Sequence, residues 1–126
     1  MQWEKERLVG ASLEDLIEKI EDRRDRPGYG YDFLSHSAIG VRRYIEVKSV
    51  GTDDDGQRFF LSDNEYRTSK SADHSGAYNF YLVFFDGSGK PASLRSFLAD
   101  QLYANAELAP ASYTVRFDLR ESAKSH

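Results

Sequence analysis

Residues 41–50 read VRRYIEVKSV, and their apolar and polar side chains alternate as they do along a half-buried β-strand. Alternate residues of a strand share one face, so Glu46 and Lys48 are expected to point to the same side. Ile45 and Val47 then point to the opposite side, into a core. The strand therefore presents a carboxylate and an ammonium group together on one face.

The segment before this strand predicts its antiparallel partner. Residues 29–35 are rich in aromatic side chains and favour a strand, whereas residues 36–40 are typical of a turn. With the turn centred near Ile39, Asp32 and Glu46 are equidistant from it and lie opposite each other to within one or two residues. The hairpin is therefore expected to bring two carboxylates and one lysine together at a sheet edge.

The grouping of two carboxylates with one lysine suits the binding of a divalent cation. Two neighbouring carboxylates repel each other as anions, and a hard divalent cation such as Mg²⁺ or Mn²⁺ removes the conflict. Such a metal polarises a phosphoryl oxygen and lowers the pKa of water, while a lysine stabilises the charge of a phosphodiester transition state. The set Asp32, Glu46 and Lys48 thus predicts metal-assisted phosphodiester hydrolysis. A surface hairpin, whose solvated acids pair with Arg43 or Lys48, is the open alternative.

The remaining elements follow from periodicity and turn signals. Residues 77–85 form the most hydrophobic stretch and predict a central strand, and residues 62–65, SDNE, predict a capping box at a helix start. Helices are expected over 3–20 (restarting after Gly10 with Ser12 as cap), 62–72 and 93–106. Further strands are expected over 58–61 and 112–117, with a loop over 51–56. This order indicates an α/β or α+β fold, with a mixed central sheet flanked by helices.

Length and composition restrict the classes of function. The 126 residues suit one domain, with a core over about 8–118 and a polar tail over 119–126. The net charge of -4 argues against a protein that coats nucleic acid by bulk positive charge, although it leaves a local basic groove open. The absence of cysteine excludes disulfides and thiolate zinc sites. No apolar run approaches the ~20 residues of a membrane span, so we expect a cytoplasmic protein without a membrane partner.

Four blocks of sequence, in this order, resemble a known family. They are residues 30–35 (GYDFLS), 43–49 (RYIEVKS), 60–66 (FLSDNEY) and 78–83 (YNFYLV). Asp32 and the Glu-x-Lys tripeptide are similar to the PD-(D/E)xK nuclease core. More narrowly, the blocks resemble the domain at the C-terminus of the plant protein NO VEIN, over roughly residues 8–85.

The resemblance implies a restriction-endonuclease-like fold and assigns roles to individual residues. Asp32, Glu46 and the carbonyl of Val47 would be metal ligands, with Lys48 as the catalytic lysine. The pattern of the first helix would add Glu14 as a further catalytic and metal-binding acid. At the position before Glu14, however, this chain carries a leucine where the family commonly has a glycine, and a solvated Glu14 is the alternative.

Two further groups of residues have both a functional and a plain interpretation. Glu65 stands where the family block carries a glutamate, although a capping box also explains it. Four basic residues could line a phosphate-binding groove or form an ordinary surface, namely Arg42, Arg43, Arg67 and Lys70. The arginines of residues 22–26, DRRDR, alternate with aspartates and are expected to be neutralised by them.

The expected function is therefore divalent-metal-dependent hydrolysis of DNA by an endonuclease-like domain, in a restriction or phage-defence setting. The isolated domain should bind DNA weakly, so a second copy or a larger defence-system partner is an expected partner. The alternative is a catalytically degenerate module with the same fold, which recognises nucleic acid or protein within a larger complex.

Overall fold

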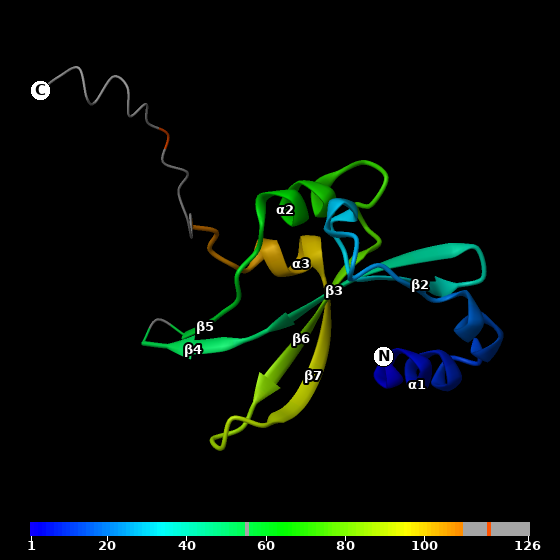
Figure 1. The fold of residues 1–126 in the computed structure, drawn as a ribbon, viewed down its shortest axis with the longest axis horizontal. Helices are drawn as coiled ribbons and strands as arrows, with labels where there is room; N and C mark the ends of the chain where they lie inside the picture. Colours follow the sequence, from blue (N-terminus) through cyan, green and yellow to red (C-terminus); the bar gives the residue numbers. More distant parts are fainter. Residues whose placement is uncertain (55, 110–115, 117–126) are drawn as a thin grey trace, which may run out of the picture.

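The computed structural model describes residues 1–54, 56–109 and 116. Its strands form a five-stranded mixed sheet of order β1-β2-β3-β6-β7 and a separate two-stranded β4–β5 sheet. Figure 1 shows β6 and β7 beside β3, and the β4–β5 hairpin apart from them. The strands are β1 (Glu21–Asp22), β2 (Phe33–Ala38), β3 (Val41–Ser49), β4 (Gly51–Asp53), β5 (Gly56–Arg58), β6 (Tyr78–Phe85) and β7 (Pro91–Leu98). The helices are α1 (Gln2–Gly10), α2 (Asp63–Lys70) and α3 (Ala99–Ala104), with 3₁₀ helices η1 (Glu14–Lys19) and η2 (Pro27–Tyr29). The predicted mixed α and β class is confirmed.

The β2–β3 hairpin has the predicted register. Phe33 lies opposite Ile45, and the backbone N–H of Asp32 donates to the carbonyl of Ile45 at 2.8 Å. Continuing this register places Asp32 opposite Glu46. The first strand of this hairpin, β2, begins at Phe33 rather than at residue 29, because the preceding Pro27–Tyr29 segment forms η2.

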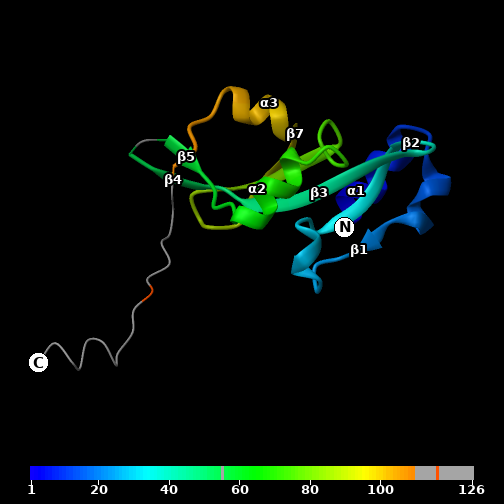
Figure 2. The same cartoon turned by 90° about the horizontal axis from the view of Figure 1, so that it is seen from above.

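The two faces of the large sheet have separate cores. On one face Tyr44, Tyr78 and Phe80 pack against Ala99 and Tyr103 of α3. Figure 1 shows α2 and α3 on this side of the sheet and α1 on the other. Figure 2, turned by 90°, shows the β4–β5 hairpin projecting at the end of the molecule opposite β1.

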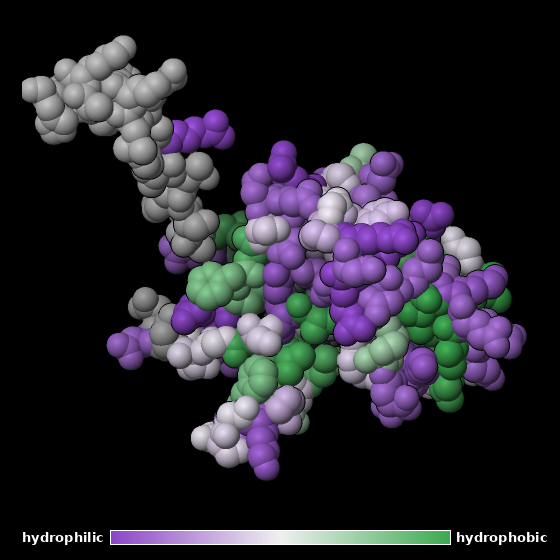
Figure 3. All heavy atoms as spheres, viewed as in Figure 1, coloured by the Kyte–Doolittle hydropathy of each residue, from purple (hydrophilic) through white to green (hydrophobic). Residues whose placement is uncertain are grey.

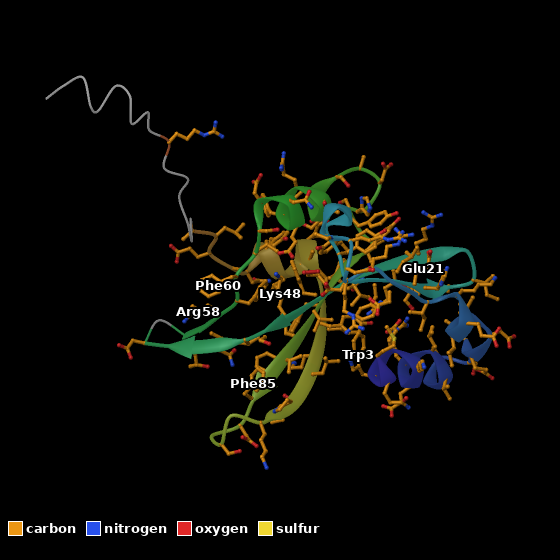
Figure 4. The ribbon with its side chains drawn as sticks, in the orientation of Figure 1. Trp3, Glu21, Lys48, Arg58, Phe60 and Phe85 are labelled. Atoms are coloured by element: carbon orange, nitrogen blue, oxygen red, sulfur yellow. The ribbon has the colours of Figure 1, made fainter. Side chains whose placement is uncertain are left out.

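The opposite face packs against α1. Phe33, Ile45 and Tyr81 form its buried cluster, and Trp3 contacts both aromatic residues, with ring centroids 5.9 Å from Phe33 and 4.8 Å from Tyr81. Figure 4 shows Trp3 between α1 and the sheet. The alternation of residues 41–50 thus sends Ile45 to one core and leaves Glu46 on the α2 and α3 side.

The first predicted helix is shorter than periodicity suggested. The α-helix ends at Gly10, and the segment Glu14–Lys19 is a 3₁₀ helix. Ser12 does not cap it, because Ser12 has a left-handed φ of 60° and Leu13 occupies the cap position. The N–H of Leu13 instead donates to the carbonyl of Leu8 at 2.8 Å, which turns the chain.

The predicted helix over 93–106 is also wrong in its first half. Residues 91–98 form β7, and only Ala99–Ala104 is helical. Leu94 and Phe97, whose spacing of three suggested a helix, pack against the two opposite faces of the sheet. Pairing of this segment with the edge of β6 therefore outweighs its helical periodicity.

Two other predictions differ from the structure. The predicted loop over 51–56 contains β4 and the first residue of β5, and the strand expected over 58–61 is replaced by Gly56–Arg58. The strand expected over 112–117 (apart from Arg116) and the tail over 119–126 lie outside the described residues. Among the helices that are described, none combines the length and apolarity that a membrane crossing needs.

Candidate functional site

Three carboxylates meet in a cleft between the β2–β3 hairpin and the start of α2. The cleft has a volume of about 460 Å³, and Asp32, Glu46 and Glu65 line it. Asp32 precedes β2, Glu46 lies in β3, and Glu65 lies in the first turn of α2. Figure 3 shows hydrophilic side chains gathered over α2 on this side of the molecule.

The capping box of α2 positions Glu65. The backbone N–H of Glu65 donates to the hydroxyl of Ser62 at 3.1 Å, and Oε1 of Glu65 accepts from the N–H of Ser62 at 2.9 Å. This confirms the predicted helix start. The same Oε1 atom also accepts from Nζ of Lys48 at 2.7 Å, so the cap and the sheet share one carboxylate.

Lys48 links two of the carboxylates. Its Nζ atom lies 2.7 Å from Oε1 of Glu65 and 3.6 Å from Oε1 of Glu46. Figure 4 shows Lys48 beneath α2 and α3, over the centre of the sheet. Glu46 and Lys48 are two residues apart on one strand and therefore share a face, as the alternation predicted.

Asp32 is held by the strand itself. Its Oδ2 atom accepts from the backbone N–H of Val47 at 2.8 Å. The side chain thereby continues the hydrogen bonding of β2 to β3 past the point where β2 begins. This bond fixes the Asp32 carboxylate beside the Glu46-Val47-Lys48 segment.

Glu46 and Glu65 titrate very differently. Glu46 is only 4% exposed, and this burial, its hydrogen bond to Glu65 and the charge of Asp32 raise the pKa of Glu46 to about 9. Burial also acts to raise the pKa of Glu65, but hydrogen bonds from Glu46, Lys48 and the Ser62 backbone lower it to about 2. At neutral pH the metal-free protein therefore holds a proton on Glu46, which donates to an ionised Glu65.

We expect the metal-free protein to lose stability between pH 5 and pH 8 because of Glu46. The folded-state pKa of about 9 lies above the ordinary value of 4.5, so the folded protein keeps a proton that the unfolded chain releases in this window. The stability contributed by this proton is complete below the ordinary pKa and declines by about 1 kcal/mol per pH unit as pH rises toward 9. Urea unfolding in EDTA measures it. The Glu46→Gln variant should remove this slope, and an equal slope in the variant would contradict the assignment.

The carboxylates of the cleft are of the ligand type that a hard divalent cation prefers. Three carboxylates line the cleft and Lys48 contacts two of them, and the excess negative charge is relieved in the metal-free protein by the proton of Glu46. Within the described residues, no group of three or more acidic or histidine side chains already has the arrangement of a metal site. Mg²⁺ commonly uses one or two carboxylates and completes its shell with water or substrate phosphate. Asp32 and Glu46 fit that mode of binding.

Comparison with known proteins places this chain in a family. The family model described as Protein NO VEIN, C-terminal, matches residues 1–96. The chain belongs to this family. Neither the curated proteins nor the solved structures contain a match to the chain. All the acidic residues of the cleft, and Lys48, lie within the part that matches the NO VEIN C-terminal domain.

The structure does not bring Glu14 into the cleft of this NO VEIN-type domain. Glu14 begins η1 and is exposed, and the cleft is lined by other residues. Glu65 provides the third carboxylate in its place. The resemblance to the family's helix pattern suggested Glu14, whereas the turn at Ser12 separates residues 14–19 from α1.

The predicted basic residues are spread over several surfaces. Arg43 lies on the α1 side of the sheet, where its Nε atom donates to the hydroxyl of Tyr81 at 2.8 Å, and Arg42 is exposed. On α2, Arg67 pairs with Asp63 at 2.9 Å and Lys70 pairs with Asp100 at 3.4 Å. None of the four lines the cleft as the structure describes it.

Two arginines that the sequence suggested were neutralised do line the cleft, namely Arg23 and Arg24. They follow β1, which pairs with β2 through only two residues. The N–H of Arg23 then donates to the carbonyl of Asp32 at 2.7 Å. So short a strand has no periodicity that a sequence pattern could reveal.

We expect Gly30→Ala to destabilise the domain by about 2–4 kcal/mol, because the site's wall leaves no room for a side chain there. Gly30 has a left-handed φ of 77°, and an added Cβ atom would overlap the side chain of Thr68 on α2. Thermal unfolding measures the loss. Gly28→Ala is the matched control, since a Cβ at Gly28 meets no atom within 4 Å and should cost less than about 1 kcal/mol. Equal effects of the two variants would contradict this account.

Proposed function

We propose that this NO VEIN-type domain hydrolyses phosphodiester bonds of DNA in a reaction that depends on Mg²⁺ or Mn²⁺, as a member of the PD-(D/E)xK group. The observation that carries the proposal is the meeting of Asp32, Glu46 and Glu65 in one cleft, with Nζ of Lys48 in contact with Glu46 and Glu65. The hairpin register and the alternation of β3 produce this meeting. An ordinary solvated hairpin would not bury Glu46.

In the proposed mechanism, Asp32, Glu46 and the backbone carbonyl of Val47 would hold the cation. A bound divalent metal supplies a Lewis acid for the phosphoryl oxygen and lowers the pKa of the attacking water. The carboxylate of Glu46 becomes available for this role when it releases its proton. Asp32 is already oriented by the N–H of Val47.

Lys48 supplies positive charge to the reacting phosphate. Its ammonium group donates to the water or to the phosphate oxygen on which negative charge develops in the transition state. Glu65 acts as a positioning residue, because its 2.7 Å contact holds Nζ of Lys48 beside the carboxylates of the cleft. Helix α2 thereby contributes Glu65 to the site.

The test combines metal binding and cleavage in the full-length chain. Mn²⁺ should raise the melting temperature of the wild-type protein, and Mg²⁺ or Mn²⁺ should permit cleavage of plasmid DNA that EDTA abolishes. Glu46→Gln should lose both effects. In EDTA it should stay folded, because the amide can still donate to Glu65 and carries no charge. Cleavage that persists in Glu46→Gln would refute the assignment of this cleft.

A second function is favoured by one observation. The described residues contain no ready-made group of metal-binding side chains, and the Glu46–Glu65 hydrogen bond with the Lys48 ion pair satisfies the cleft without a cation. A recognition or assembly module with a degenerate site accounts for this arrangement. Absence of both the Mn²⁺ effect and cleavage, with retained binding to DNA, to a second copy or to a defence-system partner, would favour it.

A further inference from the structure

One wall of the cleft carries an arginine that none of the proposed catalytic roles uses. The backbone N–H of Arg23 donates to the carbonyl of Asp32 at 2.7 Å, so Arg23 is attached directly to the residue that bears a cleft carboxylate. Its side chain lines the same cleft as Glu46. An anion that reaches the carboxylates and their metal therefore passes close to this guanidinium group.

The guanidinium group of Arg23 is held in place by aromatic side chains. Its central carbon lies 4.1 Å from the ring centroid of Tyr29 and 5.5 Å from that of Tyr31. One of its terminal nitrogens also donates to the hydroxyl of Tyr31. The Arg23 side chain is 18% exposed, so the group is ordered yet reachable. A preorganised arginine loses little side-chain freedom when it binds a phosphate.

The charge of Arg23 is weakly compensated. Among the described residues its acidic partner is Glu21, at 3.2 Å, and the Glu21 side chain is 54% exposed. Arg24 differs, because two of its nitrogens contact both carboxylate oxygens of Asp22. A solvated ion pair with a single contact contributes little free energy, so an incoming phosphate can replace Glu21. Figure 4 shows Glu21 away from Lys48, toward the β1 side of the sheet.

We propose that Arg23 binds a phosphate of the DNA backbone that neighbours the phosphodiester held at the carboxylates. The inference rests on the proposed function for its choice of DNA as the ligand. Arg23 acts by contacting the substrate, and its planar group suits phosphate oxygens. While DNA is absent, Glu21 forms an ion pair with this guanidinium group.

The test measures DNA binding without cleavage. The full chain carrying Glu46→Gln is titrated in EDTA against a fluorescein-labelled 20-base-pair duplex at several salt concentrations. Adding Arg23→Gln should weaken binding about tenfold and reduce the slope of log affinity against log salt by about 0.9, the value for one lost phosphate contact. Arg95→Gln is the matched control. Arg95 also stacks on an aromatic ring, that of Phe97 at 5.0 Å, but does not line the cleft.

A second pair of variants tests the same contact in the opposite direction and leaves Arg23 in place. Glu21→Gln frees the guanidinium group and should strengthen DNA binding severalfold. Glu18→Gln removes an equal charge from an exposed position on η1 and should have a smaller effect. Combining Glu21→Gln with Arg23→Gln should abolish the gain, because the two residues act through one contact. The comparison of Glu21→Gln with Glu18→Gln decides the matter even if Arg23→Gln unfolds.

The outcomes separate this inference from the proposed function. An unchanged salt slope in folded Arg23→Gln, equal effects of Glu21→Gln and Glu18→Gln, or no DNA binding at all would overturn the role of Arg23. Cleavage by the wild-type protein, measured separately, leaves the proposed hydrolysis standing in those cases. A reduced slope in a protein that never cleaves DNA would support Arg23 and remove the nuclease assignment.

Discussion

Lys48→Met should reduce metal-dependent DNA cleavage by about 10²–10³-fold, a loss typical of removing one group that stabilises transition-state charge. The methionine keeps the length of the side chain but removes the ammonium group that contacts Glu46 and Glu65. Binding of Mn²⁺ should persist, because the oxygen ligands remain. A quenched cleavage assay gives the rate, and a thermal shift with Mn²⁺ reports the metal.

The control for this variant is Lys90→Met, which removes an exposed lysine from the turn before β7. It should cleave at the wild-type rate. Lys48→Met also leaves Glu65 with one hydrogen-bond donor fewer, so its stability has to be measured alongside its rate. Wild-type cleavage by folded Lys48→Met would show that the reaction takes place elsewhere.

Glu4→Ala should cost the domain about 3–5 kcal/mol, the range for breaking a buried ion pair by removing one partner. Glu4 lies on α1 and is completely buried. Its carboxylate accepts from Arg7 at 2.6 and 2.8 Å, from the hydroxyl of Ser35 at 2.5 Å and from that of Tyr81 at 2.7 Å. The alanine leaves three donors without this acceptor on the α1 face of the sheet.

The pH dependence of Glu4 follows from the same contacts. Burial acts to raise its pKa, but the hydrogen bonds from Arg7, Ser35 and Tyr81 and the charge of Arg7 outweigh it, so the pKa lies below 4.5. A lowered carboxyl pKa stabilises the folded protein above the unfolded-state pKa, and that contribution disappears as pH falls through the folded-state pKa. Wild type and Glu4→Ala should therefore converge in stability at low pH.

Urea unfolding measures this difference, and Glu6→Ala provides the control on the same helix. Glu6 is exposed, and its substitution should change the free energy of unfolding by less than about 0.5 kcal/mol. A loss of similar size in both variants would show that α1 propensity, and not the buried carboxylate, accounts for the effect of Glu4→Ala.

The family and the strand that bears Glu46 and Lys48 could be recognised from sequence because their signals are local. The alternation of residues 41–50 places Glu46 and Lys48 on one face, and counting outward from Ile39 gives the pairing of Asp32 with Glu46. The capping box at Ser62 and Glu65 is equally local, since both hydrogen bonds join residues three apart. Backbone geometry imposes these relations over a few residues, whatever surrounds them.

The conformation of residues 91–98 and the position of Glu14 depend on tertiary contacts rather than on local sequence. Leu94 and Phe97 satisfy a helical spacing, yet residues 91–98 form β7 because these two side chains pack against cores on opposite faces of the sheet. Glu14 has the right position along the chain for a site residue, but a turn between α1 and η1 leaves it exposed. Local propensity differs by about 1 kcal/mol or less per residue, so tertiary pairing and burial override it.

By itself, the sequence determined the hairpin, its register, the face that bears Asp32, Glu46 and Lys48, and the start of α2. Only the tertiary structure decided that Glu65 contacts Lys48, that Arg23 reaches the cleft, and that Glu46 holds a proton. These facts depend on contacts between segments far apart in the chain and on the removal of water around them. Periodicity carries no information about either, because burial and charge are properties of the assembled fold.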